Sequence, residues 1–153
     1  MTSAMRRVAA VCVTTAVAAS LVSCADEADE RVVGKRWQVT EIYDDPGLPR
    51  SAPEGTVPPT VVFGRESYTG DGACGEFRGS LTWRDDDIVA VSEPETVRAA
   101  ECSPAARVFD DRLRAQLAGE FIVGAPDPEL RMTAVGDHPP GEAAPGWSAV
   151  TTG

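Results

Sequence analysis

The stretch Phe77-Arg78-Gly79-Ser80-Leu81-Thr82-Trp83 alternates apolar or small side chains with polar ones. Successive side chains of a strand point to opposite faces, so Phe77, Gly79, Leu81 and Trp83 share one face and the polar residues share the other. This alternation is typical of a strand that lays one face on a core and turns the other towards water. The stretch therefore predicts a half-buried β-strand.

Short runs of the same kind lie before and after this stretch. They are residues 32–43, 60–64, 66–70, 88–92, 95–100, 120–124 and 129–134. The residues expected on one face of the first run are Val33, Lys35, Trp37, Val39 and Glu41. Residues 44–59 are rich in Pro and Gly and predict a surface loop. Residues 146–152 can add an edge strand or remain loose.

One segment changes from the period of a strand to that of a helix. Ser103 can cap a helix, Pro104 can open it and Gly119 can end it. Its core face would hold Ala106, Phe109, Leu113, Gln116 and Leu117, and its solvated face Arg107, Asp110, Asp111, Arg112 and Arg114. Many short strands and one helix predict an α+β fold, a small antiparallel β-sheet or partly closed β-barrel with one amphipathic helix packed on it.

The first 23 residues have the pattern of an export signal. Arg6 and Arg7 precede an uncharged run that reaches Cys24 before the first acidic residue. This run is shorter than the ~20 residues that cross a bilayer. Its end, Leu21-Val22-Ser23-Cys24, resembles the lipobox of bacterial lipoproteins, which implies cleavage before Cys24 and a diacylglyceryl group on its sulfur. The resemblance predicts a lipid anchor on the extracytoplasmic face of the cell membrane.

The charge of the remaining chain is strongly negative. Loss of residues 1–23 leaves 12 basic and 24 acidic side chains, which moves the net charge from −10 to −12. This balance argues against nucleic-acid binding and against a polybasic contact with anionic lipid. Residues 24–31 are an acidic tether, and residues 135–153 form a Pro/Gly-rich C-terminal segment.

Two cysteines are left once Cys12 is removed and Cys24 is assigned to the lipid. In an exported protein such a pair, here Cys74 and Cys102, most simply forms one disulfide. The loop it closes would stabilise the fold by about 3 kcal/mol. A redox pair would usually be C-x-x-C, and a zinc site needs more ligands than two Cys and the single His138. We expect no metal and no cofactor.

The residues around these cysteines resemble the META domain, a family that includes the HslJ-like heat-shock proteins of bacterial envelopes. The block Gly72 to Leu81 is similar to the family pattern G-x-x-G-C-N-x-x-x-G-x-Y at Cys74, Gly79 and Leu81. A second block resembles the family's T-x-M-x-C segment at Thr96 and Cys102, and the helix resembles the family's at Phe109 and Leu113.

The likeness covers about residues 32–134, and it departs from the family pattern at several positions. Gly75 stands where the family usually has Asn, and Leu81 where it often has an aromatic residue. Ala99-Ala100-Glu101 replaces the Met-containing approach to the second cysteine. The resemblance implies an envelope location and an association with stress tolerance, and the family has no shared catalytic apparatus.

The sequence does not gather the groups that catalysis needs. His138 lies beside two prolines, and the serines at 67, 80 and 92 have no G-x-S-x-G setting. The run 85–87 of three Asp is typical of a solvated turn. Glu93 and Glu95 would share a strand face, but no pattern places them in a pocket.

We therefore expect a non-catalytic, monomeric envelope protein that acts by protein-protein contact or in envelope stress tolerance. The alternative is a small-ligand-binding or protease-inhibiting β-barrel on the cell surface, in which some aromatic side chains line a cavity instead of forming the core. Those side chains are Trp37, Phe63, Phe77, Trp83, Phe109 and Phe121.

Overall fold

The computed structural model describes residues 30–45, 48–84, 87–137 and 144–152, which hold nine strands and one helix. The strands are β1 Arg36–Tyr43, β2 Thr60–Phe63, β3 Ser67–Gly72, β4 Gly75–Arg84, β5 Ile88–Val91, β6 Glu95–Ala99, β7 Gly119–Gly124, β8 Glu129–Ala134 and β9 Gly146–Thr151, and the helix α1 is Pro104–Leu117. Cys24 and His138 lie outside the described residues, as do the first two Asp of 85–87.

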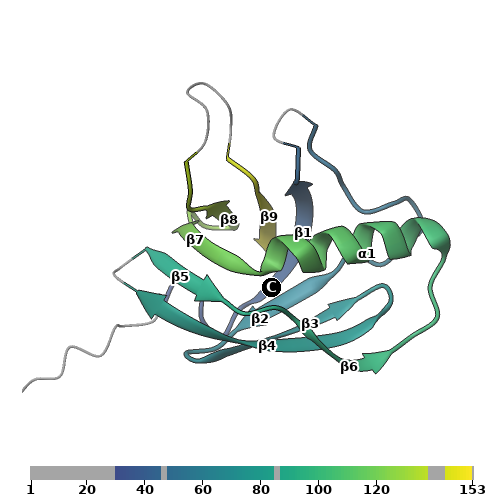
Figure 1. Ribbon diagram of the computed structural model, residues 1–153, viewed down its shortest axis with the longest axis horizontal. Coiled ribbons are helices and arrows are strands. Elements are labelled where there is room, and N and C mark those ends of the chain that lie inside the picture. Colours follow the sequence, from purple (N-terminus) through teal and green to yellow (C-terminus); the bar gives the residue numbers. More distant parts are fainter. Residues whose placement is uncertain (1–29, 46–47, 85–86, 138–143, 153) are drawn as a thin grey trace, which may run out of the picture.

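Eight of the strands form a closed antiparallel barrel (Figure 1). The order is β3-β2-β1-β9-β8-β7-β5-β4, and the pairing of β4 with β3, from Ser67↔Ser80 to Gly72↔Gly75, closes the ring. The ninth strand, β6, pairs with β4 beyond the end of β5. The predicted antiparallel sheet with one packed helix is confirmed, and the barrel is closed rather than partly closed.

The last strand, β9, lies inside the sheet. It pairs with β1 on one side and with β8 on the other, so the prediction of an edge strand or a loose segment was wrong. Trp147 and Ala149 are buried in the core and give β9 an apolar inner face. The folded unit therefore continues past residue 134 to Thr151.

The first strand carries a β-bulge that the predicted alternation missed. Its register against β9 shifts between Val39 and Glu41, so the buried side chains are Trp37, Val39 and then Ile42. The extra residue moves Glu41 out of the inner face because a bulge changes the side that later side chains occupy. Residues 33 and 35 precede the strand and are not part of that face.

Large aromatic side chains fill the interior of the barrel. The predicted inner face of β4 is confirmed, with Phe77, Leu81 and Trp83 buried. Phe63 stacks on Trp147 with ring centroids 6.0 Å apart. Gly79 completes the β4 face because a Cβ there would lie 2.4 Å from the Tyr68 ring, which real side chains cannot tolerate.

The helix begins as predicted, and one of its faces differs from the prediction. The hydroxyl of Ser103 accepts a hydrogen bond from the amide of Ala106, and Pro104 occupies the first turn. Ala106, Phe109, Leu113 and Leu117 are buried, as expected. The helix ends at Leu117, and Gly119, with φ of +140°, opens β7.

Two side chains predicted on the solvated face of α1 turn towards the barrel instead: Asp110 is buried and Arg114 is partly buried. Asp110 is 2% exposed, and Arg114 Nε donates to its Oδ2 at 2.7 Å. The Arg114 guanidinium also lies 4.8 Å from the centroid of the Phe77 ring. The Asp110 carboxylate fits beside the barrel because Gly72 has no side chain: a Cβ there would lie 2.0 Å from Asp110 Oδ1.

The predicted disulfide between Cys74 and Cys102 is present. It joins the turn between β3 and β4 to the segment that precedes α1. The start of the helix is therefore tied to the barrel by a covalent bond. Within the described residues, no helix has both the length and the apolar character that a membrane crossing requires.

Candidate functional site: a groove on the outer face of the barrel

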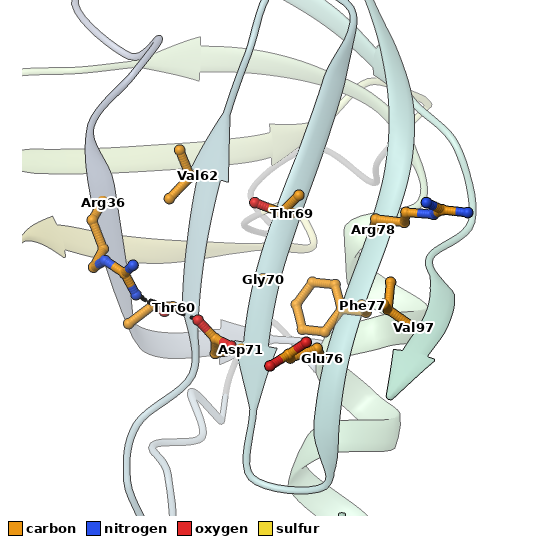
Figure 2. Close-up of a pocket in the computed structure, with 10 residues that line it drawn as sticks. All are labelled: Arg36, Thr60, Val62, Thr69, Gly70, Asp71, Glu76, Phe77, Arg78 and Val97. Carbon is orange, nitrogen blue, oxygen red and sulfur yellow. Dashed lines mark hydrogen bonds and ion pairs between the residues drawn. The ribbon is translucent and has the colours of Figure 1, made fainter. Parts of the chain in front are cut away.

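A groove of about 360 Å³ runs across the outer face of strands β1, β2, β3, β4 and β6 (Figure 2). Its lining residues are Arg36, Thr60, Val62, Thr69, Gly70, Asp71, Glu76, Phe77, Arg78 and Val97. Their side chains come mostly from the outward positions of strands whose alternate residues build the core. The same alternation that fills the barrel thus composes the groove.

The floor of the groove is apolar. Val62 is half-buried, and Val97 is 53% exposed. Behind them the ring of Phe77 lies against the backbone of Gly70, where a Cβ would come within 2.2 Å of the ring. Figure 2 shows this ring beside Gly70 and next to Val97. The close packing gives the groove a rigid back wall, since neither strand can shift without displacing the ring.

The rim of the groove carries charges of both signs. Asp71 and Glu76 are directly opposite each other on β3 and β4, an arrangement of like charges that is unfavourable alone. Arg36 Nη1 lies 3.4 Å from Asp71 Oδ2 and 3.2 Å from Thr60 Oγ1, and Arg98 pairs with Glu76. These pairs are exposed and contribute roughly 0–1 kcal/mol each, so a partner can rearrange them at little cost.

Two ionisable groups near the barrel have perturbed pKa values, and both have structural roles. Burial raises the pKa of Tyr68 to about 12, and its hydroxyl donates to the carbonyl of Ser92 at 2.8 Å. Burial also acts to raise the pKa of Asp44, but the amide of Asp45 and the guanidinium groups of Arg112 and Arg50 outweigh it and hold that pKa below its usual value. Tyr68 is therefore neutral and Asp44 ionised at neutral pH.

The residues considered for catalysis are not brought together. Ser80 and Ser92 meet through two structural hydrogen bonds: the Ser80 amide donates to Ser92 Oγ at 2.9 Å, and the Ser92 amide donates to the Ser80 carbonyl at 2.9 Å. Ser67 faces Ser80 across β3 and β4. Glu93 and Glu95 are exposed and neither lines the groove. Within the described ranges, no group of three or more His, Cys, Asp or Glu could hold a metal ion.

The sequence did not reveal the groove. Its residues come from five strands, and their outward direction is visible in the alternation of each strand. Which strands lie side by side depends on the barrel topology, which the alternation does not specify.

The comparisons with known proteins show a fold without a function. No family model matches the chain, and no curated protein matches it. An NMR structure of a protein from Burkholderia xenovorans has a TM-score of 0.56 and 17% identity, over 79% of this chain and 83% of that one. A second protein solved by NMR has a TM-score of 0.52 and 14% identity, over 81% of this chain and 94% of that one. These likenesses extend to the fold alone.

Proposed function

We propose that this chain is a non-catalytic, lipid-anchored protein of the bacterial envelope, similar to META/HslJ-like proteins, that acts by protein-protein contact through its outer groove. The observation that carries the proposal is the contrast between a packed interior and a hollowed outer face. Trp37, Trp147, Phe63 and Phe121 are each 1% exposed, while the groove has an apolar floor and a charged rim. Protein interfaces have this composition of apolar centre and polar rim.

The META-like part of the proposal draws support from the disulfide. Cys74 and Cys102 belong to the two sequence blocks that carry the resemblance, and the bond brings the blocks together. The second block also contributes Val97 to the groove, beside Glu76 and Arg78 of the first. The segments that motivated the resemblance therefore form one continuous surface.

The envelope location is proposed from residues 1–24. A diacylglyceryl group on Cys24 would hold the domain at the extracytoplasmic face, and the acidic tether 24–31 would keep it off anionic headgroups. Metabolic labelling with a fatty acid tests the anchor. The full-length protein should incorporate the label and stay with the membrane, and Cys24→Ala should do neither. An unlabelled wild-type protein, or a membrane-bound Cys24→Ala protein, would contradict it.

The contact itself can be tested by photocrosslinking in cells. A crosslinking amino acid in place of Thr69 should give a discrete adduct, since Thr69 lines the groove. Ile122 of β7, which is 49% exposed and does not line the groove, is the matched control. Equal adducts at both positions, or none at Thr69, would count against the groove.

The small-ligand alternative places the ligand in the interior of the barrel, and tryptophan fluorescence can test it. Among the described residues, Trp147 Nε1 and Asp110 Oδ1 are buried without a hydrogen-bond partner, and Trp147 Nε1, on the inner face of β9, is a donor that a ligand could satisfy. The three tryptophans are all buried, so a ligand entering the barrel must change their fluorescence. We expect no change on titration with envelope lipids, and a saturable change would favour the alternative.

A further inference from the structure

The strand β6 is an open edge of the sheet. It is the last strand in the sheet order, and of the described strands it pairs with β4 alone. All five of its residues are exposed, whereas every other described strand has at least two buried residues. An edge of this kind is a template for another strand. Figure 1 shows β6 at the margin of the fold, next to β4.

A bulge in the pairing of β6 with β4 places the two charged side chains of β6 on one face. Glu95 pairs with Arg78 and Arg98 pairs with Glu76, with a register shift between them. Residues 76 and 78 both point outward from β4, because the residue between them, Phe77, is buried. Glu95 and Arg98 therefore both point outward, although three positions separate them in the sequence. The inner face of β6 is occupied at Thr96, whose hydroxyl accepts a hydrogen bond from Arg114 at 3.4 Å.

We propose that two copies of this chain associate by antiparallel pairing of their β6 strands about a twofold axis normal to the sheet. In this register Glu95 of one copy lies opposite Arg98 of the second copy, and Thr96 lies opposite Val97 of the second copy. The symmetry repeats both contacts, so the surface is self-complementary. Both β6 strands of the dimer carry the same bulge. The distance from Glu95 to Arg98 along the strand is therefore the same in each copy, and the two charge pairs can form together.

Charge complementarity favours a second copy as the partner. Across the four strands β4, β6, β6 and β4, one row of outward side chains reads Arg78, Glu95, then Arg98 and Glu76 of the second copy. The signs alternate without interruption, and the symmetry-related row reads the same from the other side. Opposite charges facing each other across strands stabilise pairing, and like charges oppose it. A foreign strand with like charges opposite Glu95 or Arg98 would be repelled and would pair less well.

The dimer is expected to be weak. Two strands of five residues bury less than the ~1,200 Å² typical of stable interfaces. The pairing does not require the lipid anchor, and the two side chains that the test changes, Glu95 and Arg98, do not line the groove, although Val97 of the same strand does. Its failure and that of the proposed function can therefore be told apart. The proposed dimer differs from the monomer expected from the sequence, and the experiment below decides between them.

Charge reversal tests the register directly by sedimentation velocity. The mature chain with Cys24→Ala, which removes the anchor, should sediment as a reversible dimer at high concentration. Glu95→Arg and Arg98→Glu should each weaken association about tenfold or more, because each reversal creates two like-charge pairs. A mixture of the two variants should associate like the parent, since both cross-copy contacts would again join an acidic and a basic side chain. The double variant should recover for the same reason.

Controls separate the pairing from folding and from net charge. Arg107→Glu changes the charge as Arg98→Glu does, on the exposed side of α1, and should leave association unchanged. Near-ultraviolet circular dichroism should match among all variants, because the exposed pairs of Glu95 and Arg98 contribute little to stability. A parent that stays monomeric near millimolar concentration, or single variants that the mixture does not rescue, would overturn the proposal.

Discussion

The strands β9 and β6 have nearly the same length and opposite places in the fold. β9 is paired on both edges and buries Trp147 and Ala149, whereas β6 is paired on one edge and buries no side chain. Both sequences favour strand formation. The difference lies in the alternate apolar side chains that only β9 offers, and it shows that burial of one face, rather than strand propensity, decides which segment enters the barrel.

The largest effect is expected where β9 enters the core. Trp147→Ala removes a ring that is 1% exposed and stacks on Phe63, so it should lower the free energy of unfolding by about 3–5 kcal/mol. Val97→Ala on β6 is the matched change and should alter it by less than about 0.5 kcal/mol. Urea denaturation measures both. Similar losses at the two sites would break the contrast between the strands.

Removal of the disulfide should reduce the hydrogen-exchange protection of β6 more than that of β9. Cys74 precedes β4 and Cys102 follows β6, so the bond fixes the end at which these strands pair. The double variant Cys74→Ala/Cys102→Ala should lose about 3 kcal/mol of stability. Its β6 amides should exchange with solvent faster while β9 amides stay protected, as measured by hydrogen exchange. Uniform loss of protection across both strands would contradict this order.

The buried carboxylate on α1 should have a smaller effect. Asp110→Ala leaves Arg114 without its carboxylate partner in a site where the guanidinium is mostly buried, and it should cost about 1–3 kcal/mol. Asp111→Ala, on the exposed neighbour, should cost less than about 0.5 kcal/mol. Thermal denaturation of the two variants gives the comparison. Equal effects would mean that Asp110 is not held as described.

The smallest effect concerns acid sensitivity beside β1, the neighbour of β9. The pKa of Asp44 is lowered in the folded state, so the folded protein binds fewer protons there than the unfolded one. The stabilisation is complete above the unfolded pKa of about 4 and is lost as pH falls through the folded value. Asp44→Asn should be less stable than wild type at pH 7 by under about 1 kcal/mol, with the gap closing in acid. A gap that widens in acid would contradict this sign.

Local sequence patterns were sufficient for much of the fold. The alternation of β4, the Ser103 cap of α1 and the pairing of Cys74 with Cys102 all follow from neighbouring residues or from the small number of cysteines. Each of these features depends on chemistry within a few residues or on a short list of possible partners. The same local patterns also predicted the loop at residues 44–59, and its described parts contain no strand.

The features that the sequence did not reveal depend on contacts between distant segments. The interior place of β9 requires β1 and β8 as neighbours, and the burial of Asp110 requires the bare backbone of Gly72. A helical period alone assigned Asp110 to the solvated face. The groove is non-local in the same way, because five strands must be adjacent before their outward residues form one surface.

Hydrogen exchange of the full-length protein in membranes isolated from cells that produce it, compared with the same protein purified in detergent, tests the central claim most directly. If the proposed anchor and outer contact surface hold, amides of β6 and of β2 and β3 should exchange more slowly in those membranes. The already protected amides of β9 should not change. Slower exchange confined to the barrel interior, or identical exchange in both settings, would contradict an outer contact surface.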